Sequence, residues 1–251
     1  MSDPADPIFH RWVRALERRH LAELTFAEVR RALQALSSLY VERRRKLERG
    51  AALDGAGKRA AFALFYGPLH FLAVRQIVTE LGAARPPARR IFDLGCGSGA
   101  SGAAWALESG GKPELVGIEL HPWAVAETSW SWQSLGLGGR TRRCRIEGLR
   151  LPGRGAALLL AYTANELAAD ARRKLLPDLL EAAERGARVL VVEPISRRAV
   201  PWWEEWAVRF RDAGGRADRW RFTAELPQTL QRLDRAAGLD HRELTARSLY
   251  L

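Results

Sequence analysis

Apolar residues recur at helical spacing through roughly the first 82 positions of the chain. Phe9, Trp12 and Leu16 fall on one face of a helix, with arginines on the remaining surface. Thr25 and Glu28 have the spacing of a capping box, in which each residue satisfies a free backbone N–H of the other. A second helix is therefore predicted to begin at this point.

Turn and cap signals divide the rest of this N-terminal part. The second helix is expected to end in the basic run Glu42–Lys46, which places cations at the negative end of the helix dipole. Asp54–Gly57 is typical of a turn, followed by a short helix that ends near Tyr66. Pro68 suits the first position of a further helix, because its missing N–H costs nothing there.

Beyond the Pro86-Pro87 dipeptide, apolar runs of strand length alternate with helical segments. Strands are expected at 90–94, 114–118, 141–146, 156–161, 187–192, 218–222 and 243–250, with helices to about 109 and over about 123–135, 168–185, 201–213 and 227–237. This alternation predicts an α/β protein with a Rossmann-like, seven-stranded, mainly parallel sheet covered by helices on both faces. Residues 1–85 are predicted to form a helical subdomain and residues 86–251 the sheet domain.

A glycine-rich loop directly follows the first predicted strand. Its sequence, Asp-Leu-Gly-Cys-Gly-Ser-Gly, spans Asp93–Gly99. Alternating glycines let a backbone turn tightly where a side chain would collide with a bound ligand. Gly97–Gly102 also fits the G-x-G-x-x-G pattern of dinucleotide folds, and a purely structural turn is a third interpretation.

Acidic residues follow the next two strands. Ligands of an open parallel sheet bind beyond the carboxyl ends of the strands, so these residues are expected to share a site with the glycine loop. Glu119 can accept hydrogen bonds from both hydroxyls of a ribose, and Glu147 with Gly148 can meet an adenine amino group. For Glu147, a solvated surface carboxylate is an equal alternative.

Asp93 indicates which of two kinds of nucleoside ligand the glycine loop is predicted to bind. A dinucleotide loop presents N–H groups and a helix N-terminus to a pyrophosphate, which a nearby carboxylate would repel. S-adenosylmethionine (SAM) instead offers a cationic sulfonium and an amino group. SAM is therefore the predicted cofactor. The predicted cofactor-binding residues are Asp93, Gly95, Cys96, Gly97, Gly99, Glu119, Leu120, Glu147, Gly148 and Ala161.

The segment after the fourth strand is the candidate for catalysis. It reads Ala-Tyr-Thr-Ala-Asn-Glu-Leu over 161–167. Tyr162 can wall the methyl donor, and Asn165 or Glu166 can orient an acceptor, so Tyr162 and Asn165 are the predicted catalytic residues. The structural alternative is a helix N-cap at Asn165 with Glu166 in the first turn. His70 can reach the site from the helical part, although a lone histidine is more often structural.

Several of these segments together resemble a known family. Asp93–Gly99 resembles the first motif of class I SAM methyltransferases. With Ala161–Leu167, Val191–Pro194 and Tyr66–Pro68, it resembles the small-ribosomal-subunit methyltransferase-like family, which includes mitochondrial ribosome assembly factors. The resemblance implies the class I fold, SAM binding and association with the small subunit. Family members often carry a cysteine-rich iron–sulfur insertion, but residues 194–226 contain no cysteine, so no cluster is predicted.

Charge and cysteine usage bear on partners. The chain has 40 Lys and Arg against 29 Asp and Glu, and a net charge of +11 favours polyanionic partners such as RNA. Codon bias explains why only four of the 40 are lysines, but it does not explain the surplus. Cys96 and Cys144 form neither a disulfide framework nor a metal-ligand pair, so no metal site is predicted and a cytoplasmic location is expected.

The expected partners follow from these features. No apolar run in the sequence approaches the roughly 20 residues of a membrane span, so no membrane partner is predicted. Three functions stay open. They are a SAM-dependent methyltransferase acting on rRNA or the small ribosomal subunit, a small-molecule methyltransferase with a helical lid, and a SAM-binding assembly factor without turnover.

Overall fold

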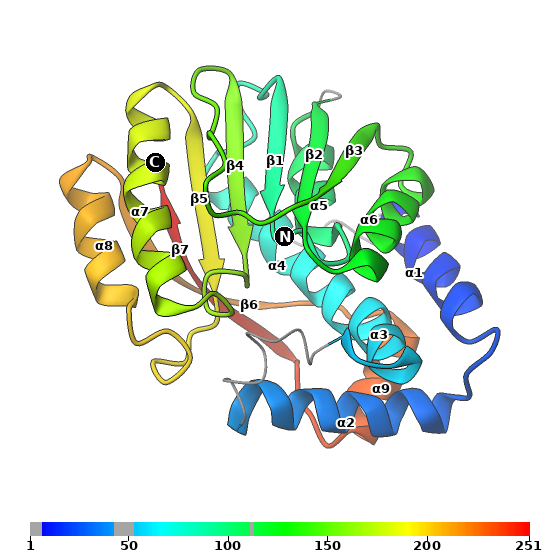
Figure 1. Ribbon diagram of the computed structural model, residues 1–251. Coiled ribbons are helices and arrows are strands. Elements are labelled where there is room, and N and C mark those ends of the chain that lie inside the picture. Colours follow the sequence, from blue (N-terminus) through cyan, green and yellow to red (C-terminus); the bar gives the residue numbers. More distant parts are fainter. Residues whose placement is uncertain (1–6, 43–52, 111–112) are drawn as a thin grey trace.

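A computed structural model describes residues 7–42, 53–110 and 113–251 of the chain. Its centre is a seven-stranded sheet with the order β3-β2-β1-β4-β5-β7-β6 (Figure 1). The strands are β1 (Arg90–Leu94), β2 (Glu114–Glu119), β3 (Gly139–Arg143), β4 (Ala156–Ala161), β5 (Arg188–Glu193), β6 (Arg216–Thr223) and β7 (Glu243–Tyr250). Strands β1 to β5 pair in parallel, and β7 lies antiparallel between β5 and β6. The predicted mainly parallel seven-stranded sheet is confirmed.

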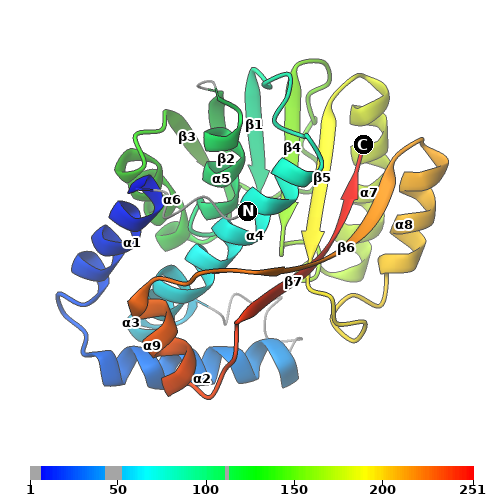
Figure 2. The same ribbon diagram turned by 180° about the vertical axis from the view of Figure 1, so that it is seen from behind.

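Helices cover both faces of this sheet (Figures 1 and 2). They are α1 (Pro7–His20), α2 (Phe26–Glu42), α3 (Ala56–Ala61), the π-helical turn η3 (Phe62–Tyr66), α4 (Gly67–Glu80), α5 (Ala100–Glu108), α6 (Pro122–Ser134), α7 (Ala169–Glu184), α8 (Trp203–Asp212) and α9 (Gln228–Ala236). Alternate residues of each central strand face opposite sides. Leu159 packs in the core with α4 and α5, whereas Leu158 and Leu160 pack in the core with α7 and α8.

The helical part of the chain shares the first of these cores. Phe9 of α1 stacks on Phe71 of α4, and Trp12 packs against the same ring at a tilt. All three lie in the same buried cluster as Trp105 of α5. The predicted capping box is present, because the Glu28 carboxylate accepts the Thr25 backbone N–H at 2.8 Å. The division at residue 85 stays a prediction, since one core joins both parts. The expected helix end at residues 43–46 lies outside the described residues.

The structure corrects the prediction that a helix starts at Pro68. Helices α3, η3 and α4 form one continuous helix, and the Gly67 N–H donates to the Phe62 carbonyl in a π-helical turn. This wider turn directly precedes Pro68, whose ring would otherwise crowd the preceding carbonyls. The expectation that no apolar stretch reaches membrane-spanning length was also wrong. The joined helix Ala56–Glu80 reaches it, but 67% of its apolar window is buried in the fold, as in a core helix.

The third strand also differs from its prediction. It covers Gly139–Arg143 instead of 141–146, and the chain then leaves the ladder. The predicted strand followed the apolar side chains of Cys144 and Ile146. Those side chains pack instead in or against the second core, where the chain bends away from the ladder after Arg143. The other predicted strands agree with the structure to within about two residues at each end.

Candidate functional site

A cavity of about 740 Å³ opens at the carboxyl ends of the parallel strands. Its walls come from the glycine loop after β1, the segments after β2, β3 and β4, the start of β7, and the inner side of the continuous helix α3–η3–α4. A volume of this size matches pockets that enclose a small ligand or cofactor. The strand-end position agrees with the general rule for open parallel sheets.

The glycine loop holds the conformation that its sequence predicts. Gly95 and Gly97 have φ values of 77° and 54°, which residues with side chains adopt only with strain. A Cβ added to Gly95 would lie 2.3 Å from the Thr163 side chain, so this glycine lets β1 and β4 approach each other. Gly97 has more room, and both glycines line the cavity together with Cys96.

Glu119, at the end of β2, binds the backbone of the glycine loop. Its carboxylate accepts the N–H groups of Leu120 at 2.7 Å and His121 at 2.9 Å through one oxygen. The other oxygen accepts the Gly97 N–H at 3.1 Å. Glu119 and Leu120 line the cavity, as predicted for residues that would hold a ribose. The carboxylate thereby ties the end of β2 to the loop after β1.

The remaining predicted cofactor residues divide into two groups. Glu147 and Ala161 line the cavity, and Glu147 is half-buried instead of being a fully solvated surface carboxylate. Gly148 is exposed and Gly99 is buried, and neither lines the cavity. Gly99 instead caps α5, and its carbonyl accepts the indole N–H of Trp132 at 2.8 Å.

Asp93 does not line the cavity. Its side chain is buried beneath the loop, where Oδ2 accepts the Gly102 N–H at 2.9 Å. Burial raises the pKa of this carboxyl to about 7, and the nearby Glu119 carboxylate adds to the rise. Asp93 therefore fixes the start of α5 beneath the site, and the expected direct contact with a ligand is corrected to an indirect role.

Tyr162 and His70 form a stacked pair in the wall of the cavity. Their ring centroids lie 3.9 Å apart with an interplanar angle of 14°. Tyr162 has a φ of 58°, a rare value for a residue with a side chain, directly after β4. Burial lowers the pKa of His70 to about 3 and raises that of Tyr162, so both rings are neutral near pH 7. His70 was the weaker sequence candidate, and it reaches the cavity.

Asn165 is held by a buried carboxylate at the end of β5. Glu193 is fully buried and accepts the Asn165 backbone N–H at 3.0 Å and its side-chain Nδ2 at 2.5 Å. Asn165 is not the N-cap of the following helix, because α7 begins only after Ala168. The N-cap alternative was therefore wrong. The amide is instead fixed by Glu193, with Asn165 and Glu166 both lining the cavity.

Several cavity residues gave no signal in the sequence. Phe62 and Tyr66 fall in a predicted helix, and only the continuous helix shows that they face the glycine loop. Glu193 does not itself line the cavity but binds Asn165, which does, and its sequence position indicates only the end of a strand. His241 lies in a segment between a helix and a strand. Long-range packing brings these residues together. Among the described residues, no group of three or more His, Cys, Asp or Glu side chains is placed to hold a metal ion.

Comparison with known proteins shows similarity in fold. No protein-family model and no curated sequence matches the chain. A candidate O-methyltransferase from Nostoc punctiforme PCC 73102 matches with a TM-score of 0.54 at 13% identity, covering 88% of this chain and 72% of that one. A SAM-dependent methyltransferase from Thiobacillus denitrificans, solved with S-adenosyl-L-homocysteine, has a TM-score of 0.47 at 15% identity and coverages of 72% and 95%. With the observed strand order, the similarity to the Nostoc protein assigns the chain the seven-stranded, Rossmann-like methyltransferase fold.

Proposed function

We propose that this protein is a SAM-dependent methyltransferase. The observation that carries the proposal is the convergence of three strand ends on one cavity. The glycine loop follows β1, Glu119 ends β2, and Glu147 follows β3. The fold similarity to known methyltransferases supports this interpretation, as does the resemblance of the Asp93–Gly99 motif.

The residues of this part of the cavity fit SAM chemically. The Glu119 carboxylate is positioned to accept ribose hydroxyls, and Leu120, Ile146 and Cys96 provide an apolar surface for an adenine ring. The Glu119 and Glu147 carboxylates in the cavity wall would repel a pyrophosphate and suit a cationic sulfonium ligand. We call Gly95, Gly97, Glu119 and Glu147 the donor half of the cavity.

The part of the cavity wall outside the donor half is suited to hold a methyl acceptor. We call His70, Tyr162, Asn165 and His241 the acceptor half. Bound SAM supplies an electrophilic methyl group, and the chain's own task is to hold the nucleophile in line with it. Neutral, stacked rings and an amide fixed by Glu193 are rigid groups that can orient a substrate.

The proposed acceptor is RNA, of the ribosomal small subunit as the family resemblance implies. Arg145 lines the cavity, Arg142 lies three residues before it, and both are exposed. Within the described parts of the chain, neither takes part in an ion pair, whereas Arg140 is engaged by Glu114. Exposed guanidinium groups beside a cavity mouth are positioned to bind phosphates. A cytoplasmic location, where ribosomes are abundant, belongs to the same proposal.

A small-molecule acceptor is the second candidate. Phe62, Tyr66 and Leu69 of the continuous helix cover one side of the cavity with mainly apolar surface. A helix in that position resembles the expected lid more than an open groove for a nucleic acid. The third function, SAM binding without turnover, predicts the same donor half and no transfer.

Two measurements test the proposed function. Calorimetric titration should show SAM binding to the full-length protein, and absence of binding would refute the proposal. Radiolabelled SAM should then be incubated with the protein and separated cell fractions. Label in the ribosomal RNA fraction supports the RNA acceptor, and label in the small-molecule fraction supports the second candidate. Binding without label in any fraction supports the assembly factor.

Arg142 in β3 and Arg145 just after it provide a sharper test of the RNA acceptor. Substitution of Arg142 and Arg145 by Gln should weaken RNA binding and reduce the slope of log K against log salt by about 2, because two phosphate contacts are lost. Arg209→Gln with Arg211→Gln is the matched control, since α8 lies at the opposite edge of the molecule (Figure 1). Equal salt slopes for both double variants would contradict the RNA surface.

A further inference from the structure

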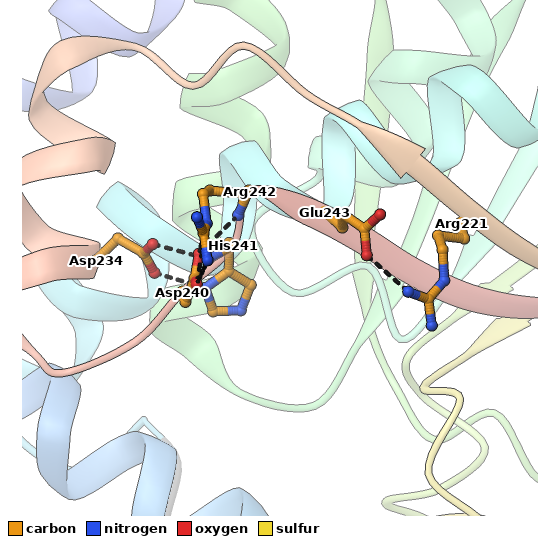
Figure 3. A network of polar contacts seen from close by, with 6 residues as sticks. All are labelled: Arg221, Asp234, Asp240, His241, Arg242 and Glu243. Atoms are coloured by element: carbon orange, nitrogen blue, oxygen red, sulfur yellow. Dashed lines mark hydrogen bonds and ion pairs between the residues drawn. The ribbon is translucent and has the colours of Figure 1, made fainter.

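An aspartate–histidine pair lies where α9 connects to β7. The Asp234 Oδ1 and His241 Nδ1 atoms are 2.6 Å apart (Figure 3). The other carboxylate oxygen, Oδ2, accepts the backbone N–H of His241 at 2.8 Å. Both oxygens of Asp234 are therefore committed to the same residue, and the carboxylate fixes the position and the orientation of the imidazole.

This contact determines which ring nitrogen is available. A carboxylate accepts hydrogen bonds, so Nδ1 of a neutral His241 carries the proton and Nε2 keeps its lone pair. No protein partner for Nε2 occurs among the described contacts of His241. The Asp234 side chain is 9% exposed, whereas the His241 side chain is 31% exposed. The pair thus has a buried anchor and an accessible outer nitrogen.

His241 lines the cavity on its acceptor side. It approaches from the start of β7, together with Leu244 and Thr245, and its ring packs edge-on against Phe65 with centroids 5.3 Å apart. Phe65 contacts the Tyr66 ring, Tyr66 contacts His70, and His70 stacks on Tyr162. Ring contacts therefore connect His241 to the wall in which we place the acceptor.

Other titratable groups near His241 are less suited to take a proton. Arg242 donates to both carboxylate oxygens of Asp240, and the Arg221 guanidinium lies 2.8 Å from the Glu243 carboxylate (Figure 3). The low proton affinity of His70 makes it a weak base, and burial raises the pKa of Tyr66 to about 12. His241 combines a free lone pair with a fixed orientation.

We propose that His241 is the general base for methyl transfer, with Asp234 as its positioning residue. The inference rests on the proposed function and specifies an acceptor with an O–H or N–H group. The acceptor heteroatom bonds to the methyl carbon while the methyl–sulfur bond breaks. The electron pair of the broken bond stays on sulfur, which becomes a neutral thioether. The acceptor's proton passes to Nε2 of His241, whose imidazolium is stabilised by Asp234 and later releases the proton to water.

The tautomer of His241 can be tested without an acceptor. Nitrogen-15 NMR of the full-length protein should show neutral His241 with its proton on Nδ1. Asp234→Asn should change that distribution, because the asparagine side chain can donate as well as accept at this position. A wild-type His241 protonated on Nε2 would overturn the proposal, since Nε2 would then have no lone pair to accept the acceptor's proton.

The kinetic test uses the fraction that wild-type protein labels with radioactive SAM. His241→Gln should lower the rate of transfer by about 100-fold or more, the usual contribution of a general base. SAM affinity and melting temperature should stay close to wild type, and added imidazole should partly restore transfer in His241→Ala. His10→Gln, a half-buried histidine on α1, is the matched control.

The outcomes separate the two proposals. Normal SAM binding and transfer in His241→Gln, with a rate within about threefold of wild type, would refute the base and leave the methyltransferase intact. Loss of SAM affinity in that variant would place His241 in the donor half and also overturn the proposed role. A wild-type protein that binds no SAM, or transfers no label to any fraction, would refute the methyltransferase and the general base together.

Discussion

The two halves of the cavity are built in different ways. In the donor half, the polar contacts run between a side chain and the backbone of neighbouring loops, as when Glu119 accepts the N–H groups of Gly97 and Leu120. In the acceptor half, side chains from distant segments contact each other. His70 stacks on Tyr162, and Asn165 is held by Glu193. Backbone contacts follow directly from a strand–loop–helix pattern, whereas side-chain pairs depend on the tertiary fold.

Two buried carboxylates show this difference most clearly. Asp93 and Glu193 stand near the carboxyl ends of β1 and β5, and each is at most 1% exposed. The Asp93 carboxylate accepts the Gly102 N–H. Glu193 accepts two from Asn165, one of them at 2.5 Å. Burial disfavours the ionised form of Asp93 more than the Gly102 hydrogen bond favours it, which agrees with its raised pKa.

The largest expected effect is a change in pH-dependent stability on replacing Asp93 by Asn. The pKa of Asp93 is about 7 in the folded protein against 3.8 as its ordinary value. Between those values, the folded state holds a proton that the unfolded state has lost. The free energy of unfolding therefore falls as pH rises through this window, by about 1.4 kcal/mol per pH unit and up to about 4 kcal/mol in all.

Asp93→Asn should remove this slope, because the amide does not titrate. Urea unfolding at a series of pH values between about 4 and 7 measures it for the variant and wild type. Asp212→Asn, at the exposed end of α8, is the control that should keep the wild-type slope. A variant whose stability still falls with pH as steeply as that of wild type would show that Asp93 is not the proton-binding group.

The second effect concerns the glycine loop. Gly97→Ala adds a Cβ at a φ of 54°, 3.3 Å from the Phe62 ring, on the wall of the donor half. SAM affinity should fall by about 100-fold, or about 2.7 kcal/mol, because the methyl group occupies ligand space and the loop must shift. Isothermal titration calorimetry measures this loss directly.

Gly136→Ala is the matched control for this change. Gly136 has a φ of 70° and no heavy atom within 4 Å of an added Cβ, so it carries similar backbone strain away from the cavity. It should lower stability by about 1 kcal/mol without changing SAM affinity. Equal SAM affinities for both variants would exclude Gly97 from the cofactor site, whatever their melting temperatures.

The same contrast explains how much the sequence could predict. The sheet and the placement of Gly97, Glu119 and Glu147 follow from hydrophobic patterning and from the rule that parallel strands end at one edge. Asp93 was predicted at the right position with the wrong contact, because a pattern does not show which way a side chain turns. The Asp234–His241 pair gave no signal, since its geometry depends on how α9 meets β7.

Asn165 lies between these cases. Its position after the fourth strand indicated catalysis, and the competing N-cap interpretation had the same local residues in its favour. The decisive partner, Glu193, lies on another strand, 28 residues away in the chain. Local spacing could therefore identify Asn165 as a candidate but could not choose between the two interpretations. Only the parallel pairing of β4 with β5 brings the amide and the carboxylate together.

The smallest expected effect tests whether that carboxylate serves the acceptor half. A glutamine at position 193 has one carbonyl oxygen, so it can accept only one of the two N–H groups that Asn165 now donates, and its own amide meets the other. Glu193→Gln should loosen the Asn165 amide and lower the rate of methyl transfer by about tenfold, equivalent to about 1.4 kcal/mol, while SAM affinity stays within about twofold. Glu184→Gln, exposed on α7, should change neither quantity. Reduced SAM affinity at an unchanged transfer rate would instead assign Glu193 to the donor half, and the separation between the two halves of the cavity would have to be abandoned.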